Sequence, residues 1–262
     1  MPPVLVFDSG VGGLSVLRAI VEAAPDLPVS YLADNALFPY GAMADDVLIA
    51  RAIDVIGHAK ERIDPSCVVI ACNTASTLVL EPLRARFDMP FVGIVPAIKP
   101  AAEQTNSHMV SVLATPGTVR RDYTQALIDT YASHVDVTLV GGPHLAAEAE
   151  KLLAGRQPDK LTIGKDIASC FVERNSARTD TIALACTHYP LLQPVFEAIA
   201  PWPVTWIDPA PAIARRVLDI LPQTKESDGE AGVLLHTGPA PNSAIVNAFA
   251  MCGVDRPERL PV

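Results

Sequence analysis

Two cysteines of the chain stand in the same local context. The sequence reads VVIACNT at 68–74 and IALACTH at 182–188, so Cys72 and Cys186 each follow an apolar run and precede polar residues. This pattern predicts a buried strand that ends at the cysteine and is followed by a helix. Because the amino end of a helix stabilises negative charge, a thiol placed there ionises more readily. The sequence therefore predicts two reactive thiols at the ends of two strands.

The other cysteines, Cys67, Cys170 and Cys252, lack this context, and we expect them to be inert buried residues. An odd number of widely spaced cysteines is not typical of a secreted disulfide framework. The chain contains no Cys-x-x-Cys pair, which argues against a structural zinc site, and we expect no metal.

Polar residues follow both reactive cysteines. Asn73, Thr74 and Thr187 could simply cap helices, and that role is compatible with a second one, holding a carboxylate of a substrate. His188 is either a core histidine or, because it lies close to Cys186, a group that tunes the thiol or relays its proton. The residue types alone leave both alternatives open.

Another polar segment, DSGVGG at 8–13, follows the first apolar run of the chain. We expect Asp8 and Ser9 at the end of that strand, where their side chains face a cleft, and the glycines are typical of a tight turn. The spacing is not Gly-x-Gly-x-x-Gly, but Asp34 after the second strand keeps a dinucleotide-binding interpretation open.

Two further segments contain candidate ligand contacts. Pro39-Tyr40-Gly41 predicts a turn whose amides could face a ligand, although a plain loop is the favoured interpretation. ATPGTV at 114–119 places Thr118 at a junction between strand and helix, as a helix cap or an anion contact, with the cap favoured.

The composition is that of a globular protein. Of the 262 residues, 50% are hydrophobic and 19% are charged, which excludes a disordered chain. The formal net charge of −9 argues against nucleic acid or an anionic membrane as a partner. The longest apolar run is far shorter than the ~20 residues of a membrane-spanning helix, and the first residues do not resemble a signal peptide. We expect a soluble, cytoplasmic protein.

Short apolar runs alternate with longer amphipathic stretches along the chain. The runs predict strands at 4–7, 29–32, 67–71, 91–94, 109–114, 135–140, 181–185, 204–207 and 233–236. The stretches predict helices at 14–24, 44–62, 76–87, 97–104, 119–131, 145–153, 160–174, 191–199, 210–221 and 243–251. Pro82 predicts a kink or break in its helix, and residues 223–232 predict a loop.

This alternation predicts an α/β fold of mostly parallel sheets flanked by helices, in which ligands bind beyond the carboxyl ends of strands. Because the cysteine context occurs twice, we expect two similar α/β domains with the active site in the cleft between them. Residues 1–97 plus 207–262 would form the first domain, which carries Asp8 and Cys72. Residues 98–206 would form the second domain, which carries Cys186 and His188.

Seven segments of the chain resemble the glutamate racemases of the aspartate/glutamate racemase superfamily. They occur in the family's order from Phe7 to Arg216: FDSGVGG, YLADNALFPYG, VIACNTAST, GIVPAIKPA, ATPGTV, LACTHYPLL and IDPAPAIARR. The paired CNT and CTH motifs are the specific ones, and Thr187-His188 resembles glutamate racemases rather than aspartate racemases. Asp208-Pro209-Ala210 departs from the family's Asp-Ser-Gly, which predicts a changed turn away from the thiols.

The resemblance implies roles for individual residues. Cys72 and Cys186 would be the two acid/base thiols, with Asp8 and His188 as their polar helpers. Glu150 is similar, on a looser match, to an acidic residue that assists the second thiol. The implied substrate contacts are Ser9, Tyr40, Gly41, Asn73, Thr74, Thr118 and Thr187.

The implied activity is cofactor-independent interconversion of L- and D-glutamate. One cysteine, as thiolate, would remove the proton on Cα, and the other, as thiol, would return a proton from the opposite face. Pyridoxal phosphate is another route to this chemistry, but it needs a Schiff-base lysine, and the nearest candidate, Lys99, lies in a predicted helix. The D-glutamate would supply peptidoglycan synthesis.

Three alternatives to this activity stay open. An aspartate or hydantoin racemase of the same superfamily would share the thiol pair, a dehydrogenase would use the DSGVGG turn, and a non-catalytic binding protein would need neither. The expected partner is the small-molecule substrate, glutamate. A homodimer and a small-molecule activator also stay open, because the surface residues carry no motif that decides them.

Overall fold

The computed structural model describes residues 1–221 and 232–262, whose strands form two sheets and one short hairpin. The larger sheet contains β1 (Val4–Asp8), β2 (Val29–Ala33), β3 (Cys67–Ile70), β4 (Phe91–Gly93), β11 (Gly232–His236) and β12 (Val254–Arg259). The smaller sheet contains β5 (Met109–Ala114), β6 (Asp136–Gly141), β9 (Thr181–Ala185) and β10 (Thr205–Ile207). The hairpin consists of β7 (Glu173–Arg174) and β8 (Ala177–Arg178).

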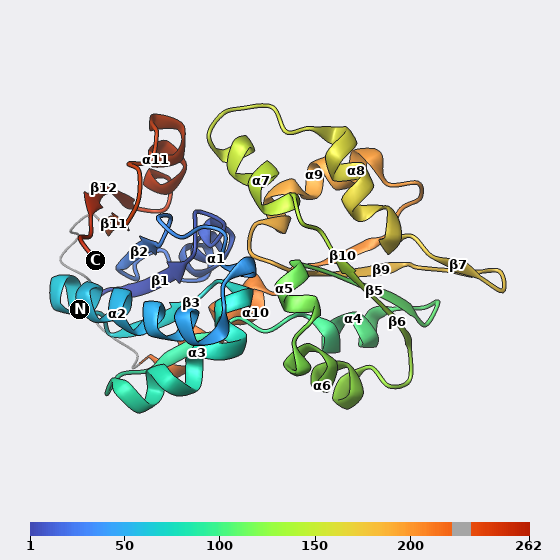
Figure 1. Ribbon diagram of the computed structural model, residues 1–262, viewed down its shortest axis with the longest axis horizontal. Coiled ribbons are helices and arrows are strands. Elements are labelled where there is room, and N and C mark those ends of the chain that lie inside the picture. Colours follow the sequence, from blue (N-terminus) through green and yellow to red (C-terminus); the bar gives the residue numbers. More distant parts are fainter. Residues whose placement is uncertain (222–231) are drawn as a thin grey trace.

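The strands are ordered β12-β11-β2-β1-β3-β4 in the larger sheet and β10-β9-β5-β6 in the smaller one. Neighbouring strands of both sheets run parallel. The two sheets form two neighbouring bodies, and the β7–β8 hairpin projects away from both (Figure 1). The predicted α/β fold with two mostly parallel sheets is confirmed.

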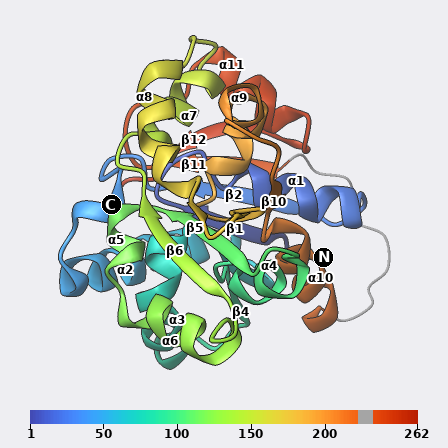
Figure 2. The same ribbon diagram turned by 90° about the vertical axis from the view of Figure 1, so that its right-hand side faces the viewer.

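The helices pack on both faces of each sheet. They are α1 (Leu14–Ala23), α2 (Asp45–Ile63), α3 (Asn73–Arg86), α4 (Ile98–Gln104), α5 (Pro116–Val119), α6 (Asp122–Tyr131), α7 (Leu145–Leu153), α8 (Lys160–Ile167), α9 (Tyr189–Ile199), α10 (Ala210–Ile220) and α11 (Ser243–Ala250), with single 3₁₀ turns η1 (Tyr40–Ala42) and η2 (Ala168–Cys170). In the larger sheet, α1, α10 and α11 cover one face, and α2 and α3 cover the other. In the smaller sheet, α7, α8 and α9 lie on one side, and α4 and α6 lie on the other (Figure 2).

Strand β1 shows why the buried strands read as continuous apolar runs. Val4 and Val6 pack against α1 and α10, whereas Leu5 and Phe7 pack against α2 and α3. Successive side chains of a strand point to opposite faces, so a strand covered on both faces needs an apolar residue at every position. The residues that end these strands then lie at the edge of the sheet, where a site can form.

The chain passes between the sheets twice. It leaves the larger sheet after β4 and enters the smaller one through α4, and it returns from β10 through α10. The predicted division into residues 1–97 plus 207–262 and residues 98–206 stays a prediction. Within the described residues, no helix combines the length and the apolar character needed to cross a membrane.

The helix predicted at 76–87 begins earlier and is unbroken. It is α3, which starts at Asn73 and continues through Pro82. A proline inside a helix removes one backbone hydrogen bond, but tertiary packing provides most of the stability of a protein helix. Val79 and Leu83 are fully buried on either side of the proline, and this packing keeps the helix continuous.

Two other predicted helices are shorter than expected. The stretch 119–131 is divided into α5 and α6, because Arg121 is extended between them. The stretch 160–174 is helical only to Ile167, after which η2 and β7 follow. Asn175 and Ser176 adopt positive φ angles of 50° and 66°, which form the two-residue turn of the β7–β8 hairpin.

Strand β12 was not predicted, because it lacks an apolar run. It contains Asp255, Arg256, Pro257 and Glu258, and it pairs with β11 alone at one edge of the larger sheet. An edge strand tolerates charged residues and proline, since one of its sides forms no ladder hydrogen bonds. The loop predicted at 223–232 lies outside the described residues, except for Gly232, which begins β11.

Candidate active site

The two cysteines with matching sequence contexts lie at the carboxyl ends of strands from different sheets. Cys72 directly precedes α3, and Cys186 directly follows β9. Both are buried and unpaired. The Cys72 Sγ lies 3.6 Å from Ser9 Oγ, and the Cys186 Sγ lies 3.8 Å from His188 Nδ1. Each thiol therefore has a polar neighbour of its own.

The ionisation of Cys72 differs from the sequence-based expectation. Burial, together with the nearby Asp8 and Cys186, raises the pKa of the Cys72 thiol to about 12. The amino end of α3 acts in the opposite direction, but desolvation outweighs it. Cys72 is therefore a neutral thiol near neutral pH, suited to donating a proton rather than accepting one.

His188 lies between the second thiol and a carboxylate. Its Nε2 is 3.2 Å from Glu150 Oε1, on the side of the ring opposite Cys186. Burial alone would lower the pKa of His188, but the interactions with Cys186 and Glu150, and the charge of Asp8, raise it well above the usual value. The imidazole is thus held in its protonated form beside Cys186.

Glu150 also joins the two bodies of the molecule. Its Oε1 accepts a 3.0 Å hydrogen bond from the backbone N–H of Val11, in the turn after β1. Burial tends to raise the pKa of Glu150, but the contact with His188 and the hydrogen bond from Val11 together outweigh this effect and lower it. A charged carboxylate on α7 therefore contacts both the turn of the larger sheet and the imidazolium of the smaller one.

Asp8 makes the corresponding connection from the larger sheet. This carboxyl group is fully buried and accepts hydrogen bonds from Gly10 N (2.8 Å) and Thr187 Oγ1 (2.9 Å). Burial raises its pKa above the usual range, although His188 and these two donors act against the shift. The carboxyl ends of β1 and β9 thus meet at Asp8 and Thr187.

Glycines of the DSGVGG turn are required because side chains from the other body lie against their Cα atoms, and not because of their backbone conformation. Positive φ angles occur at Gly155 and Gly253, but not at Gly10 or Gly12. A Cβ at Gly12 would overlap the His188 ring, and a Cβ at Gly10 would overlap the Glu150 carboxylate. The expected turn is present, with Leu14 N–H bonded to the Val11 carbonyl, and glycine at positions 10 and 12 leaves room for Glu150 and His188.

The same packing excludes the dinucleotide interpretation of this turn. A pyrophosphate would have to approach the backbone of Gly10 and Gly12, where Glu150 and His188 already lie. Asp34, the candidate ribose ligand, is instead fully buried and paired with Arg51. No nucleotide can occupy this turn without displacing both side chains.

Asn73 and Thr74, at the start of α3, do not cap the helix. The Nδ2 and Oδ1 atoms of Asn73 are buried and have no hydrogen-bond partner among the described residues. Since buried polar groups are normally satisfied, this amide is available to a ligand. Thr74 Oγ1 lies 3.2 Å from Thr115 Oγ1 and 3.5 Å from Thr118 Oγ1, which belong to the smaller sheet's side.

The cap of α5 is Thr115 and not Thr118. The Thr115 hydroxyl accepts a hydrogen bond from the N–H of Thr118, and Pro116 occupies the first turn. This leaves the Thr118 hydroxyl, which is fully buried, within the hydroxyl cluster. Threonine followed by proline is a helix-start signal, so the sequence contained the information needed to identify Thr115.

Tyr40 and Gly41 form part of η1, where a turn was expected. The Tyr40 hydroxyl donates to Asp34, and the backbone of Gly41 lies next to Gly117 of α5. Phe38, which no sequence feature indicated, packs against the His188 ring with 5.5 Å between the ring centroids. The structure thus brings predicted site residues of both sheets into two groups of contacts. One group contains both thiols with Ser9, Asp8, Thr187, His188 and Glu150, and the other contains Thr74, Thr118 and Gly41.

Comparisons with known proteins agree on one family. The model of the Asp/Glu/hydantoin racemase family matches residues 4–217. Glutamate racemase from Brucella canis is 53% identical over 227 residues, which cover 86% of this chain and 82% of that protein. Glutamate racemase from Brucella anthropi is 54% identical over 220 residues, covering 84% and 79%.

Solved structures show the same relationship. Escherichia coli glutamate racemase, in complex with L-glutamate and the activator UDP-MurNAc-Ala, superposes with a TM-score of 0.91 at 35% identity, covering 100% of this chain and 99% of that one. Aquifex pyrophilus glutamate racemase has a TM-score of 0.74 at 28% identity, covering 98% of each chain. Picrophilus torridus aspartate racemase, at 16% identity and a TM-score of 0.53, shares the fold alone and covers 83% of this chain and 92% of that one.

Proposed function

Because the chain belongs to the Asp/Glu/hydantoin racemase family and is an isomerase of the glutamate racemase type, we propose a mechanism for it. In this mechanism, Cys72 and Cys186 interconvert L- and D-glutamate by proton transfer. The observation that carries the proposal is the placement of two buried thiols at strand ends of two sheets, each with its own polar partner. A group on either side of Cα can remove a proton from one face and return one to the other.

The two thiols start in different protonation states in this mechanism. Cys186, whose Sγ lies 3.8 Å from His188 Nδ1, acts as the base and removes the Cα proton. Cys72, whose pKa is raised to about 12, donates its proton to the opposite face of the carbanion. The products are the other enantiomer, a Cys186 thiol and a Cys72 thiolate. The same steps run backwards from that state, so both directions need both cysteines.

The carbanion is the difficult intermediate, because a thiolate is a far weaker base than the carbanion that it generates. Hydrogen-bond donors aimed at the substrate carboxylate lower this barrier when they are fixed in a dry site. The free amide of Asn73 and the hydroxyls of Thr74 and Thr118 are such donors. Ser9, Gly41 and Thr187 complete the proposed contacts with glutamate.

We also propose that Asp8 and Glu150 act through other residues. Asp8 fixes Thr187 and the turn that carries Ser9. Glu150 orients His188 and keeps it protonated. The D-glutamate would supply peptidoglycan synthesis in the cytoplasm, and the activator named for the Escherichia coli enzyme, UDP-MurNAc-Ala, is itself a muramic acid derivative.

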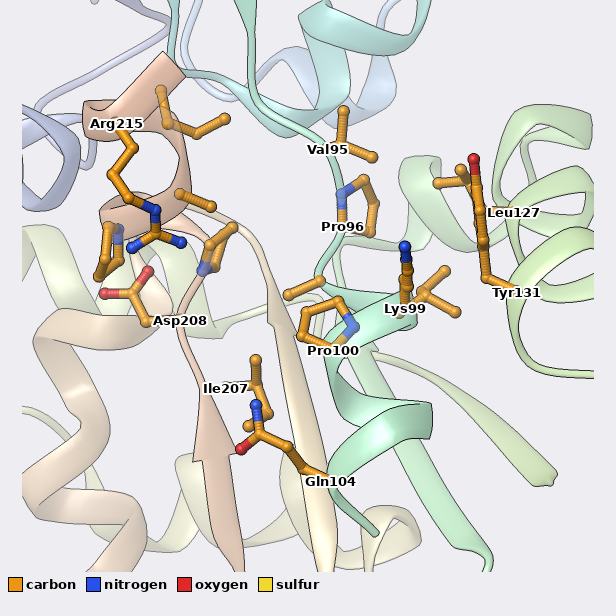
Figure 3. A pocket seen from close by; sticks show the side chains of 16 residues that line it. Val95, Pro96, Lys99, Pro100, Gln104, Leu127, Tyr131, Ile207, Asp208 and Arg215 are labelled. Atoms are coloured by element: carbon orange, nitrogen blue, oxygen red, sulfur yellow. The ribbon is translucent and has the colours of Figure 1, made fainter. Parts of the chain in front are cut away.

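A small-molecule activator of this chain would have a suitable place between the sheets. A cavity of about 420 Å³ is lined by residues of both segments that connect the two sheets: Val95–Pro100 in the first, and Ile207, Asp208, Pro209, Pro211 and Ala212 in the second. Lys99 and Arg215 contribute two positive charges to its walls, Asp208 contributes a carboxyl group, and Tyr131 contributes an aromatic ring (Figure 3). We propose that an anionic nucleotide sugar binds here and changes the angle between the two bodies.

The test of the activity is circular dichroism of L-glutamate and, separately, L-aspartate, incubated with the enzyme and a reductant but no cofactor. Loss of the signal with glutamate alone supports the proposal. Loss with aspartate alone would move the chain to the alternative activity, aspartate racemisation.

Single serine variants test the thiol roles. Cys72→Ser and Cys186→Ser should each lose racemisation but retain exchange of the α-proton with solvent for one enantiomer, opposite in the two variants. Cys252→Ser, at a cysteine outside the site, is the control and should racemise normally. Full activity of either site variant would contradict the two-thiol mechanism.

A further inference from the structure

Asp34 is a buried carboxylate that contacts neither thiol and accepts four hydrogen bonds from other side chains. Its Oδ1 accepts from Arg51 Nη2 (2.7 Å) and Thr237 Oγ1 (2.6 Å). Its Oδ2 accepts from Arg51 Nε (2.9 Å) and the Tyr40 hydroxyl (2.5 Å). Burial tends to raise the pKa of Asp34, but these donors outweigh it and lower the pKa, so the pair with Arg51 is charged.

These contacts join four separate segments of the larger sheet's body. Asp34 directly follows β2, Arg51 lies on α2, Thr237 directly follows β11, and Tyr40 begins η1. A buried ion pair contributes little net stability compared with apolar packing, because desolvation of both charges is costly. The pair instead fixes geometry, since the two parallel N–H groups of a guanidinium define the orientation of a carboxylate.

The segment whose position depends on this cluster is Tyr40–Gly41. The Tyr40 ring is buried, and its hydroxyl is tied to Asp34, so the backbone of Gly41 has little freedom to move. A Cβ built on Gly117 would lie 2.9 Å from the Gly41 carbonyl oxygen, and one built on Gly41 would lie 3.8 Å from Thr115 Oγ1. Gly41 thus lies beside the hydroxyl cluster of Thr74 and Thr115.

We propose that Asp34 and Arg51 are positioning residues for substrate binding. They hold the Tyr40–Gly41 backbone where its amides meet a carboxylate of glutamate beside Thr74. The inference rests on the proposed function, because it takes Gly41 as a substrate contact. Neither residue donates to or accepts from either thiol in the described contacts, so the pair acts on binding and not on proton transfer.

The decisive variant is Arg51→Gln, because glutamine keeps a polar amide at this mostly buried position, 16% exposed, but lacks the charge and the paired N–H groups of arginine. KM for both enantiomers should rise about tenfold or more, with kcat changed less than about threefold, since a contact equally strong in ground and transition states affects KM alone. Arg51→Lys keeps the charge but not the paired N–H groups, and should restore part of the affinity. Asp34→Asn should raise KM in the same way.

The matched control is Arg62→Gln. Arg62 lies on the same helix, α2, and is 54% exposed. Its Nη2 forms a 2.6 Å ion pair with Glu258, and none of the hydrogen bonds or ion pairs described for it involves η1. This variant should keep the wild-type KM and kcat.

An unchanged KM in Arg51→Gln, with or without loss of kcat or of thermal stability, would overturn the inference and leave the pair with a structural role only. Failure of the wild-type enzyme to racemise glutamate would instead overturn the proposed function. The two failures are distinguished because the wild type is assayed first.

Discussion

At the scale of single residues, burial of Asp8 in the site acts against ionisation of its carboxyl group. Burial raises the pKa of this carboxyl, so its ionised form is less stable in the folded protein than in the unfolded chain. The resulting loss of folding stability is absent below a pH of about 3.9, the pKa of the aspartate in the unfolded chain. It grows as the pH rises toward the higher pKa of Asp8 in the folded protein, and it is complete above that pKa. The fold therefore disfavours ionisation of a carboxyl group that belongs to the proposed site.

The variant Asp8→Asn should therefore be more stable than the wild type and less active. Asparagine can still accept from Gly10 N–H, but it carries no charge. The melting temperature at pH 7.5 should rise by about 2–4 °C, and kcat should fall about 100-fold or more. The difference in melting temperature should shrink as the pH approaches about 4. A lower melting temperature at pH 7.5 would show that Asp8 stabilises the fold.

Glu150 makes a second prediction at the same scale. The raised pKa of His188 stabilises the fold fully below the unfolded value of about 6.5 and loses this contribution as the pH rises through the higher folded value. Removing the Glu150 carboxylate in Glu150→Gln should lower the pKa of His188. The alkaline limb of kcat/KM against pH should then move to lower pH. The control Glu258→Gln, away from the site, should leave the pH profile unchanged. If the alkaline limb of Glu150→Gln stays where it is in the wild type, Glu150 does not set the pKa of His188.

The turn after β1 gives a prediction at the scale of elements. Gly12→Ala should displace the His188 ring, because the added methyl group overlaps it, and activity should fall at least 100-fold in a folded protein. Gly57→Ala is the control: it lies inside α2, where the added Cβ meets Phe87 at an ordinary 3.7 Å. This change should leave activity intact and stabilise the helix by roughly 1 kcal/mol. Activity and thermal melting of both variants check the prediction.

The elements that sequence predicted best are those covered on both faces. Strands β5 and β9 begin and end at the predicted residues, because burial requires an apolar residue at every position. Strand β12 lies at an edge, where that requirement does not apply, and its charged residues gave no signal. The division of 119–131 into α5 and α6 depends on the extended Arg121, a conformation that no residue type dictates.

The site shows the same contrast. The repeated Cys72 and Cys186 contexts identify the strand ends, because the polar residues that follow an apolar run are local features. The bond between Asp8 and Thr187 joins residues from different sheets and cannot be read from local pattern. The neutral state of Cys72 also depends on tertiary burial, which here outweighs the local influence of the helix start.

The cavity between the connecting segments gives a prediction for the whole molecule. Under the proposed activation, a ligand in this cavity would contact both connecting segments and change the relative positions of the two sheets, and with them the separation of the thiols. UDP-MurNAc-Ala should therefore raise the wild-type kcat/KM about tenfold, within the range of typical coupling between sites. Lys99→Ala should reduce the ratio of rates with and without the nucleotide. If the wild-type enzyme has the same rate with and without UDP-MurNAc-Ala, the proposed activation is wrong.

Strand β12 has a consequence for how copies of this protein meet in a crowded solution. An open sheet edge invites strand addition by another chain, and proteins resist this with charges and proline. The outer edge of the larger sheet carries Asp255, Arg256 and Glu258, and Pro257 lacks the N–H that a docking strand would need. The homodimer, which stays a prediction, would have to form through another surface, and the concentrated enzyme should resist edge-to-edge polymerisation along β12.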